Sequence, residues 1–140
     1  MKRLALFFGF MLIALHAYSQ LASITVTVKD FRNQNGSVLV GIYTSKNDFL
    51  KKTAMRKAVK ITSPEVIVSF DNLPPGEYAV SIIHDENDNK EFDRNKIGFP
   101  KEGYCFGNNA LGRLGTPSYD QVKIVLKGES VSQTLKMKYL

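Results

Sequence analysis

Residues 66–93 read VIVSFDNLPPGEYAVSIIHDENDNKEFD. The first five residues place valine, valine and phenylalanine at every second position, and a period of two predicts a half-buried β-strand. Residues 71–76 then form a firm connection, because the two prolines fix their φ angles and cannot donate hydrogen bonds to a ladder. The run that follows, residues 78–83, is apolar on both faces, which predicts a central strand of a sheet.

The same period of two recurs over most of the chain. It predicts seven strands, at residues 24–29, 38–42, 57–62, 64–70, 78–83, 121–126 and 132–139. Asparagine and glycine, which tolerate the positive φ angles of tight turns, separate the first two strands at Asn35-Gly36. No helix of useful length is predicted. Short strands at this spacing predict an all-β domain, a single seven-stranded antiparallel β-sandwich.

The first nineteen residues, 1–19, are expected to be a signal peptide. Residues 4–15 form an apolar run that follows two basic residues and is too short to span a bilayer comfortably. Residues 17–19 offer the small side chains that a signal peptidase reads, so cleavage is expected before Gln20; an uncleaved N-terminal anchor is the alternative. Cleavage would leave residues 20–140 as one exported domain in the periplasm or extracellular space, with no membrane span.

The chain has a formal net charge of +6 at pH 7, but its basic residues are dispersed along the sequence. Nucleic-acid binding would require a clustered basic face with interleaved aromatic residues, so no nucleic-acid partner is expected. Solvated surface charge is the simpler interpretation. Weak attraction to an anionic polysaccharide or a membrane surface remains open.

Cys105 is the only cysteine, so the chain cannot form an internal disulfide bond. The domain must therefore be held together by its apolar core, with a bound ion as a further contribution. A nucleophilic Cys105 would need an adjacent base, and a pairing with His84 has no supporting motif. A buried or half-buried structural cysteine is expected instead.

Residues 85–93, Asp-Glu-Asn-Asp-Asn-Lys-Glu-Phe-Asp, predict a calcium loop. Oxygen-bearing side chains occupy positions one, three, five and nine, and a hard divalent cation requires clustered oxygens of this kind. The expected ligands are Asp85, Asn87, Asn89, Glu91 and Asp93. Calcium (Ca2+) is therefore the expected cofactor, with a dissociation constant on the order of 10⁻⁴ to 10⁻³ M, typical of extracellular modules.

Two residues of this loop differ from a standard calcium loop. Lys90 stands at the sixth position, where glycine makes the sharp turn without strain, and Lys96 stands at the twelfth, where a bidentate glutamate is usual. The alternative interpretation is therefore a polar turn, in which the Asp and Asn side chains cap the loop's own backbone amides.

The segment between Asp85 and Tyr119 is long, rich in glycine and almost without strand pattern. Such a connection in a compact domain is usually functional, or is organised by something other than a ladder. Its aromatic side chains either pack a small core or form an exposed contact surface. In the second case Tyr104, Phe106 and Tyr119 would form a stacking platform for a carbohydrate or peptide, such as a cell-envelope glycan or protein partner.

An ordered set of motifs resembles the family known as domain of unknown function 2141, a family of exported bacterial proteins. The motifs are FDNLPPGEYAV at 70–80, HDENDN at 84–89, FD at 92–93, IGFPKEGY at 97–104, FGNNA at 106–110 and GTPSY at 115–119. The similarity extends over about residues 24–140. The resemblance implies a transthyretin- or immunoglobulin-like β-sandwich, similar to carboxypeptidase-regulatory and collagen-adhesin B-type modules. It implies no established activity, and the family usually has glycine in place of Lys90.

These observations predict a secreted, non-enzymatic module with a structural or binding role, whose calcium loop orders the glycine-rich segment. A carbohydrate- or peptide-binding domain that uses the loop aromatics is one alternative. A hydrolase that uses His84 with Asp85 or Glu102 as acid and base is another, and the paired carboxylates Asp93 and Glu102 would suit glycoside chemistry. However, the spacing assembles no Ser, Cys or metal triad. His84 is expected to be a hydrogen-bonding residue at a strand end.

Overall fold

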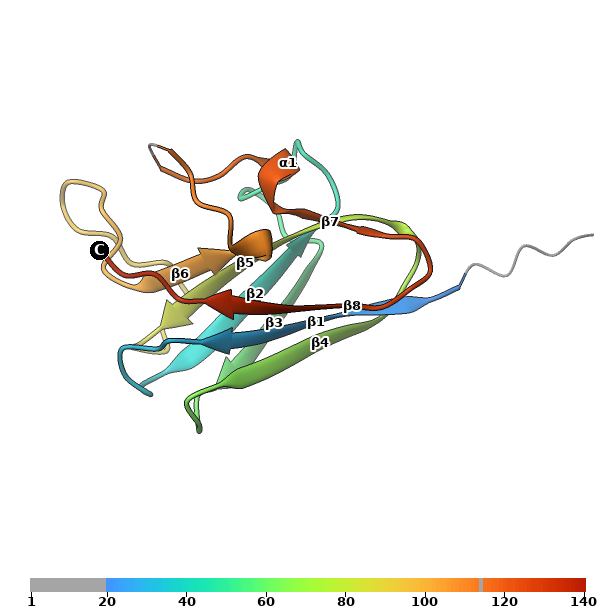
Figure 1. Ribbon diagram of the computed structural model, residues 1–140. Coiled ribbons are helices and arrows are strands. Elements are labelled where there is room, and N and C mark those ends of the chain that lie inside the picture. The colour runs from blue at the N-terminus through green and yellow to red at the C-terminus, as the bar shows by residue number, and fades with distance from the viewer. Residues whose placement is uncertain (1–19, 114) are drawn as a thin grey trace, which may run out of the picture.

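The computed structural model describes residues 20–113 and 115–140, so the expected signal peptide, residues 1–19, lies outside the described residues. The strands are β1 (Ala22–Lys29), β2 (Ser37–Tyr43), β3 (Met55–Lys60), β4 (Val66–Leu73), β5 (Gly76–Asp85), β6 (Gly103–Phe106), β7 (Lys123–Leu126) and β8 (Val131–Lys136). A 3₁₀ turn, η1 (Gly107–Asn109), and a one-turn helix, α1 (Tyr119–Val122), lie between β6 and β7 (Figure 1). None of the described helices is long and apolar enough to cross a membrane.

The strands form two sheets. One has three strands in the order β4-β1-β8, and the other has five, in the order β3-β2-β5-β6 with β7 also paired to β5. β5 pairs with β2 along one side, and along the other it pairs first with β7 and then with β6. The prediction that residues 78–83 form a central strand is therefore confirmed.

The all-β prediction is confirmed, but the prediction of seven antiparallel strands is wrong in two respects. β6 is an eighth strand, paired with β5 from Ser81↔Phe106 to His84↔Gly103. In addition, β1 and β8 pair in parallel, from Ile24↔Val131 to Lys29↔Lys136. Side-chain periodicity shows which face of a strand is buried but not its direction, and β6 is too short to show a period.

The main core lies between the two sheets and is formed by alternate residues of each strand. In β1 the burial alternates strictly, with Ile24, Val26 and Val28 fully buried. Val40 of β2 and Ile82 of β5 reach the same cluster from the other sheet. The two sheets therefore pack face to face in a sandwich-like arrangement. Each such aliphatic side chain contributes about 1.5–3 kcal/mol by its burial.

A second, smaller cluster covers part of the outer face of the five-stranded sheet. It consists of Tyr43, Ala79, Phe106, Tyr119 and Val122, with Phe49, Tyr104 and Ala110 packed against it. The helix α1 delivers two of these side chains, and its first turn is closed by a capping box between Ser118 and Gln121. The outer face beside this cluster is left open to solvent, and the candidate ligand pocket lies there.

Candidate functional site

The Asp/Asn loop begins at the buried end of β5 with Asp85. One carboxylate oxygen of Asp85 accepts a hydrogen bond from the backbone N–H of Asn89 at 3.1 Å, and the other accepts from the N–H of Lys90 at 2.8 Å. Asp85 is fully buried. Lys90 has a φ of 65°, so the sixth position makes the sharp turn that the sequence predicts, although no glycine stands there.

The asparagine side chains connect the two ends of the loop. The side-chain amides of Asn87 and Asn89 donate to the two carboxylate oxygens of Asp93, at 2.8 Å and 3.0 Å. Their carbonyl oxygens accept from the backbone N–H groups of Asn89 and Glu91. Four of the five predicted ligands are thus brought together, whereas the side chain of Glu91 is exposed. The hydrogen bonds are those of the self-capped polar turn, the alternative that the sequence left open.

The side chain of Glu102 links the two ends of the Asp/Asn loop. Its two carboxylate oxygens accept hydrogen bonds from the backbone N–H groups of Glu86 at 3.1 Å and Asp93 at 3.0 Å, so it connects the first and last turns of the loop. Burial raises the pKa of Glu102, and the nearby charges of Asp93 and Asp85 raise it further. The sequence did not predict this clamping role. Among the described residues, no group of three or more His, Cys, Asp or Glu side chains could hold a metal ion.

His84 is held by hydrogen bonds at both ring nitrogens. Nε2 lies 2.8 Å from the backbone carbonyl oxygen of Asn35, and Nδ1 lies 2.7 Å from the hydroxyl oxygen of Tyr139. Because a carbonyl oxygen only accepts, Nε2 carries the proton and Nδ1 accepts from Tyr139. The prediction of a hydrogen-bonding residue at a strand end is confirmed, and neither nitrogen is directed toward a substrate-sized space.

Cys105 is buried in the main core, as predicted, and its sulfur lies 3.5 Å from the sulfur of Met137. Burial raises the pKa of the Cys105 thiol to about 12. The thiolate, which is the nucleophilic form, is therefore absent near neutral pH. This cysteine is a packing residue.

The aromatic side chains of the glycine-rich segment pack a small core, the first of the two interpretations that the sequence offered. Phe106 and Tyr119 are only 6% and 5% exposed, and both pack against the ring of Phe49 in the second cluster. Their positions on β6 and α1 direct them onto the outer face of the sheet, where the loops cover them. The alternative of an exposed platform therefore does not hold for these two rings. Tyr104 remains partly exposed, and Tyr104 and Phe106 both line a pocket.

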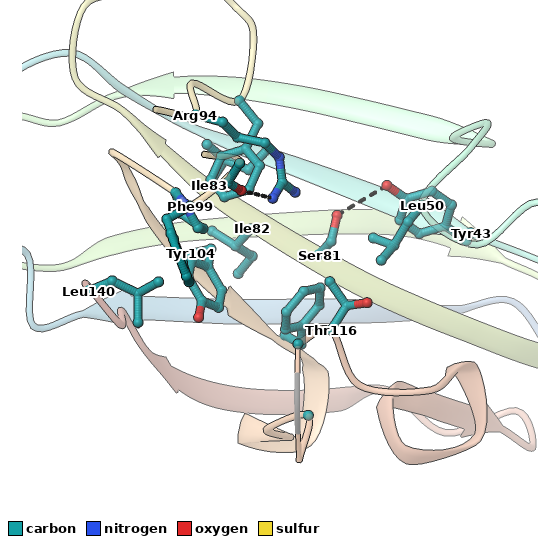
Figure 2. Close-up of a pocket in the computed structure, with 16 residues that line it drawn as sticks. Tyr43, Leu50, Ser81, Ile82, Ile83, Arg94, Phe99, Tyr104, Thr116 and Leu140 are labelled. Atoms are coloured by element: carbon teal, nitrogen blue, oxygen red, sulfur yellow. Dashed lines mark hydrogen bonds between the residues drawn. The ribbon is translucent and has the colours of Figure 1, made fainter. Parts of the chain in front are cut away.

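This pocket has a volume of about 790 Å³ and lies on the outer face of the five-stranded sheet, beside the second cluster (Figure 2). Its lining is mostly apolar and includes Ile83, Phe92, Phe99, Tyr104, Phe106 and Leu140. Three of the exposed large apolar side chains of the chain gather at it, namely Leu50, Phe99 and Leu140. Small-molecule sites are typically about 300–1,000 Å³, mostly apolar, with a few placed polar groups.

The polar groups of the pocket come from the sheet and from the segment after the Asp/Asn loop. On the sheet, the hydroxyl oxygens of Tyr43 and Ser81 lie 3.2 Å apart. Opposite them, the guanidinium of Arg94 projects over the opening, held by a 3.0 Å hydrogen bond to the carbonyl oxygen of Gly98 (Figure 2). Its central carbon lies 4.9 Å from the centroid of the Phe92 ring.

Sequence reasoning missed Tyr43, Ser81 and Arg94. For the two strand residues a signal existed, because β2 is apolar on both faces and its outward residue Tyr43 would otherwise be solvated. Such two-sided strands indicate that something covers the outer face of the sheet. No comparable signal existed for Arg94, which belongs to an irregular segment and reaches the pocket only through the hairpin that it forms with Pro100.

The fold and the site define a class of protein: an all-β domain of two packed sheets with a ligand-sized, mostly apolar pocket on one outer face. The chain belongs to the family described as "Uncharacterized protein conserved in bacteria (DUF2141)", whose model matches residues 26–134. The family resemblance is therefore confirmed, and the match extends from β1 into β8. No curated protein matches the chain. No solved structure matches it either.

Proposed function

We propose that this protein is an exported, non-enzymatic binding module that holds a small ligand with an apolar body in the pocket between β5, β6 and residues 92–100. The observation that carries the proposal is the pocket itself, with its size, its apolar lining and its few polar groups. The structural or binding role implied by the family resemblance, and its likeness to carboxypeptidase-regulatory and collagen-adhesin modules, agree with this proposal.

The Asp/Asn loop has a place in the same proposal, because it leads directly into the pocket wall. Phe92 and Arg94 line the pocket, and they flank Asp93, which the loop amides hold by both oxygens. Glu102 fixes the backbone of Asp93 from the other side. Ordering of the loop therefore fixes the two lining side chains. Bound calcium would order the loop further and remains a prediction of the sequence.

The lining favours an apolar ligand over a glycan. A sugar presents a hydroxyl group on nearly every carbon, and each one that is buried requires a hydrogen-bond partner. The pocket offers few such partners, chiefly the hydroxyl groups of Tyr43, Ser81, Tyr104 and Thr116 and the side chain of Arg94. Aromatic and aliphatic side chains instead supply the contact area that an apolar body requires.

The proposal is tested with N-phenyl-1-naphthylamine, a neutral probe that fluoresces in apolar surroundings. We expect saturable binding with one probe per chain. Ser81→Phe places a ring in the pocket and should abolish binding, and Phe99→Ser, which changes a residue 56% exposed, should weaken it without straining the sheet. Ile67→Ser is the matched control, because Ile67 is 66% exposed on β4 and does not line the pocket.

Absence of probe binding to the folded protein would refute the proposal. Equal loss of binding in Ile67→Ser and Phe99→Ser would also refute it, because the probe would then be binding to scattered surface side chains. Circular dichroism of each variant shows whether the fold is retained, so that a loss of binding can be assigned to the pocket.

A further inference from the structure

The pocket lining contains a positively charged side chain. Among the described residues that line it, only Arg94 has a charged side chain. The sequence neighbour Asp93 makes no ion pair with Arg94, and its two carboxylate oxygens accept hydrogen bonds from Asn87 and Asn89 instead. Within residues 20–113 and 115–140, the ion pairs are made by other cations, and Arg94 is in none of them.

The guanidinium is also held in position before any ligand arrives. One N–H group donates to the carbonyl oxygen of Gly98, and the ring of Phe92 lies against the guanidinium. The short hairpin that carries Arg94 is fixed by the side chain of Asn95, whose oxygen accepts from the N–H groups of Ile97 and Phe99. A guanidinium has five N–H donors, so those that do not face Gly98 can bind an anion.

A further donor lies on the floor of the pocket. The hydroxyl groups of Tyr43 and Ser81 are 3.2 Å apart, and either one can be the donor. Whichever donates, the accepting hydroxyl keeps its own hydrogen, and no second acceptor for it is found among the described residues. Both residues are largely buried and both line the pocket, so this hydroxyl is available to donate to a ligand acceptor.

We infer that the ligand is an apolar carboxylate, with its body against the aromatic lining and its carboxylate on Arg94. This inference rests on the proposed function and specifies its ligand class. A carboxylate has the planar, two-oxygen geometry that a guanidinium pairs with bidentately. Its single negative charge also matches the single positive charge of Arg94. A phosphate dianion would leave one charge uncompensated in mostly apolar surroundings, which is unfavourable.

The test compares decanoate with decanol, which has the same apolar chain and no charge. Each is titrated, below its aggregation limit at pH 7.5, into the protein loaded with N-phenyl-1-naphthylamine, and displacement of the probe is followed by fluorescence. We expect decanoate to displace the probe at a concentration about tenfold to a hundredfold lower than decanol, because a hydrogen bond to a charged group contributes on that scale.

The variants assign this preference to Arg94. Arg94→Gln should abolish the difference between the two competitors, with each displacement corrected for the affinity of the variant for the probe. Arg94→Lys should retain part of the difference, because it keeps the charge but loses the bidentate geometry. Arg56→Gln, an exposed arginine on β3 that does not line the pocket, is the matched control and should leave the preference unchanged.

The outcomes separate the two proposals. If decanoate and decanol displace the probe equally, or if the preference survives in Arg94→Gln, the assignment of a carboxylate ligand is overturned while the pocket remains a binding site. Stronger displacement by decanol would overturn it as well. If the probe does not bind at all, the proposed function itself fails, and the ligand assignment fails with it.

Discussion

Replacement of Asp85 by alanine should destabilise the protein by removing the main cap of the Asp/Asn loop. The carboxylate is buried and accepts hydrogen bonds from the backbone N–H groups of Asn89 and Lys90, at 3.1 Å and 2.8 Å. A hydrogen bond to a charged group contributes about 1.5–3 kcal/mol. Because the loop amides regain some hydration and a buried charge is removed, we expect the free energy of unfolding to fall by about 2–4 kcal/mol in total.

The assay is urea unfolding followed by circular dichroism, with EDTA present throughout. Asp71→Ala is the matched control, because Asp71 is an exposed aspartate on β4 and its loss should change the free energy of unfolding by less than about 0.5 kcal/mol. If the two variants lose the same stability, the carboxylate of Asp85 does not hold the loop and the reasoning is refuted.

The same proteins in about 5 mM calcium test the predicted ion site. An ion that binds only the folded state with a dissociation constant on the order of 10⁻⁴ to 10⁻³ M would add about 1–2 kcal/mol at that concentration. The increase should occur in the native protein and be absent in Asp85→Ala. An unchanged native protein would contradict calcium binding and leave the loop as a self-capped turn.

Three further predictions concern the rest of the fold. In Gly103→Ala the new Cβ would lie 2.3 Å from Cε1 of Tyr139, so we expect a loss of about 1–3 kcal/mol in urea unfolding; unchanged stability would contradict this packing. Cys105, with its pKa raised to about 12 by burial, should not react with Ellman's reagent at about pH 8 until the protein is unfolded, and rapid native reaction would show that the thiol is accessible. Burial raises the pKa of Glu102 above its ordinary value of 4.5, so the folded protein favours the protonated carboxyl group. The stability that this group contributes is therefore present below pH 4.5 and is lost as the pH rises through the raised pKa. A carboxyl resonance of Glu102 that titrates at or below 4.5 in NMR would refute that direction.

The main core could be predicted from the sequence because apolar residues alternate with polar ones along the strands, and the apolar ones are buried. In β1 every second residue is buried, and Ile24, Val26 and Val28 were identified from that period alone. Strand direction and short strands carry no such signal. β6 has four residues that begin with a glycine, and it is paired with β5 and, through Tyr104, with Lys138. Strand direction and the formation of β6 therefore depend on tertiary contacts, which the alternation of apolar residues in the sequence does not show.

The candidate site was predicted in part. The oxygen pattern of the loop identified Asp85 and its neighbours, because their spacing is local in sequence. The pocket could not be predicted in that way, because Tyr43, Ser81 and Arg94 belong to three separate segments that only the fold brings together. Packing of the segment's aromatics was predicted, but the partner of Phe106 was not, since Phe49 lies in a loop distant in sequence.

The parallel pairing of β1 with β8 has a consequence for the time at which the protein can fold. The first strand of the domain takes its partner from the last, Val131–Lys136. A chain that leaves the ribosome N-terminus first therefore cannot complete the three-stranded sheet until β8 has been synthesised. Pairings between residues so distant in sequence are also slow to form. The three-stranded sheet is therefore expected to close after the five-stranded sheet has its strands, so β1 and β4 wait for β8 as their third partner.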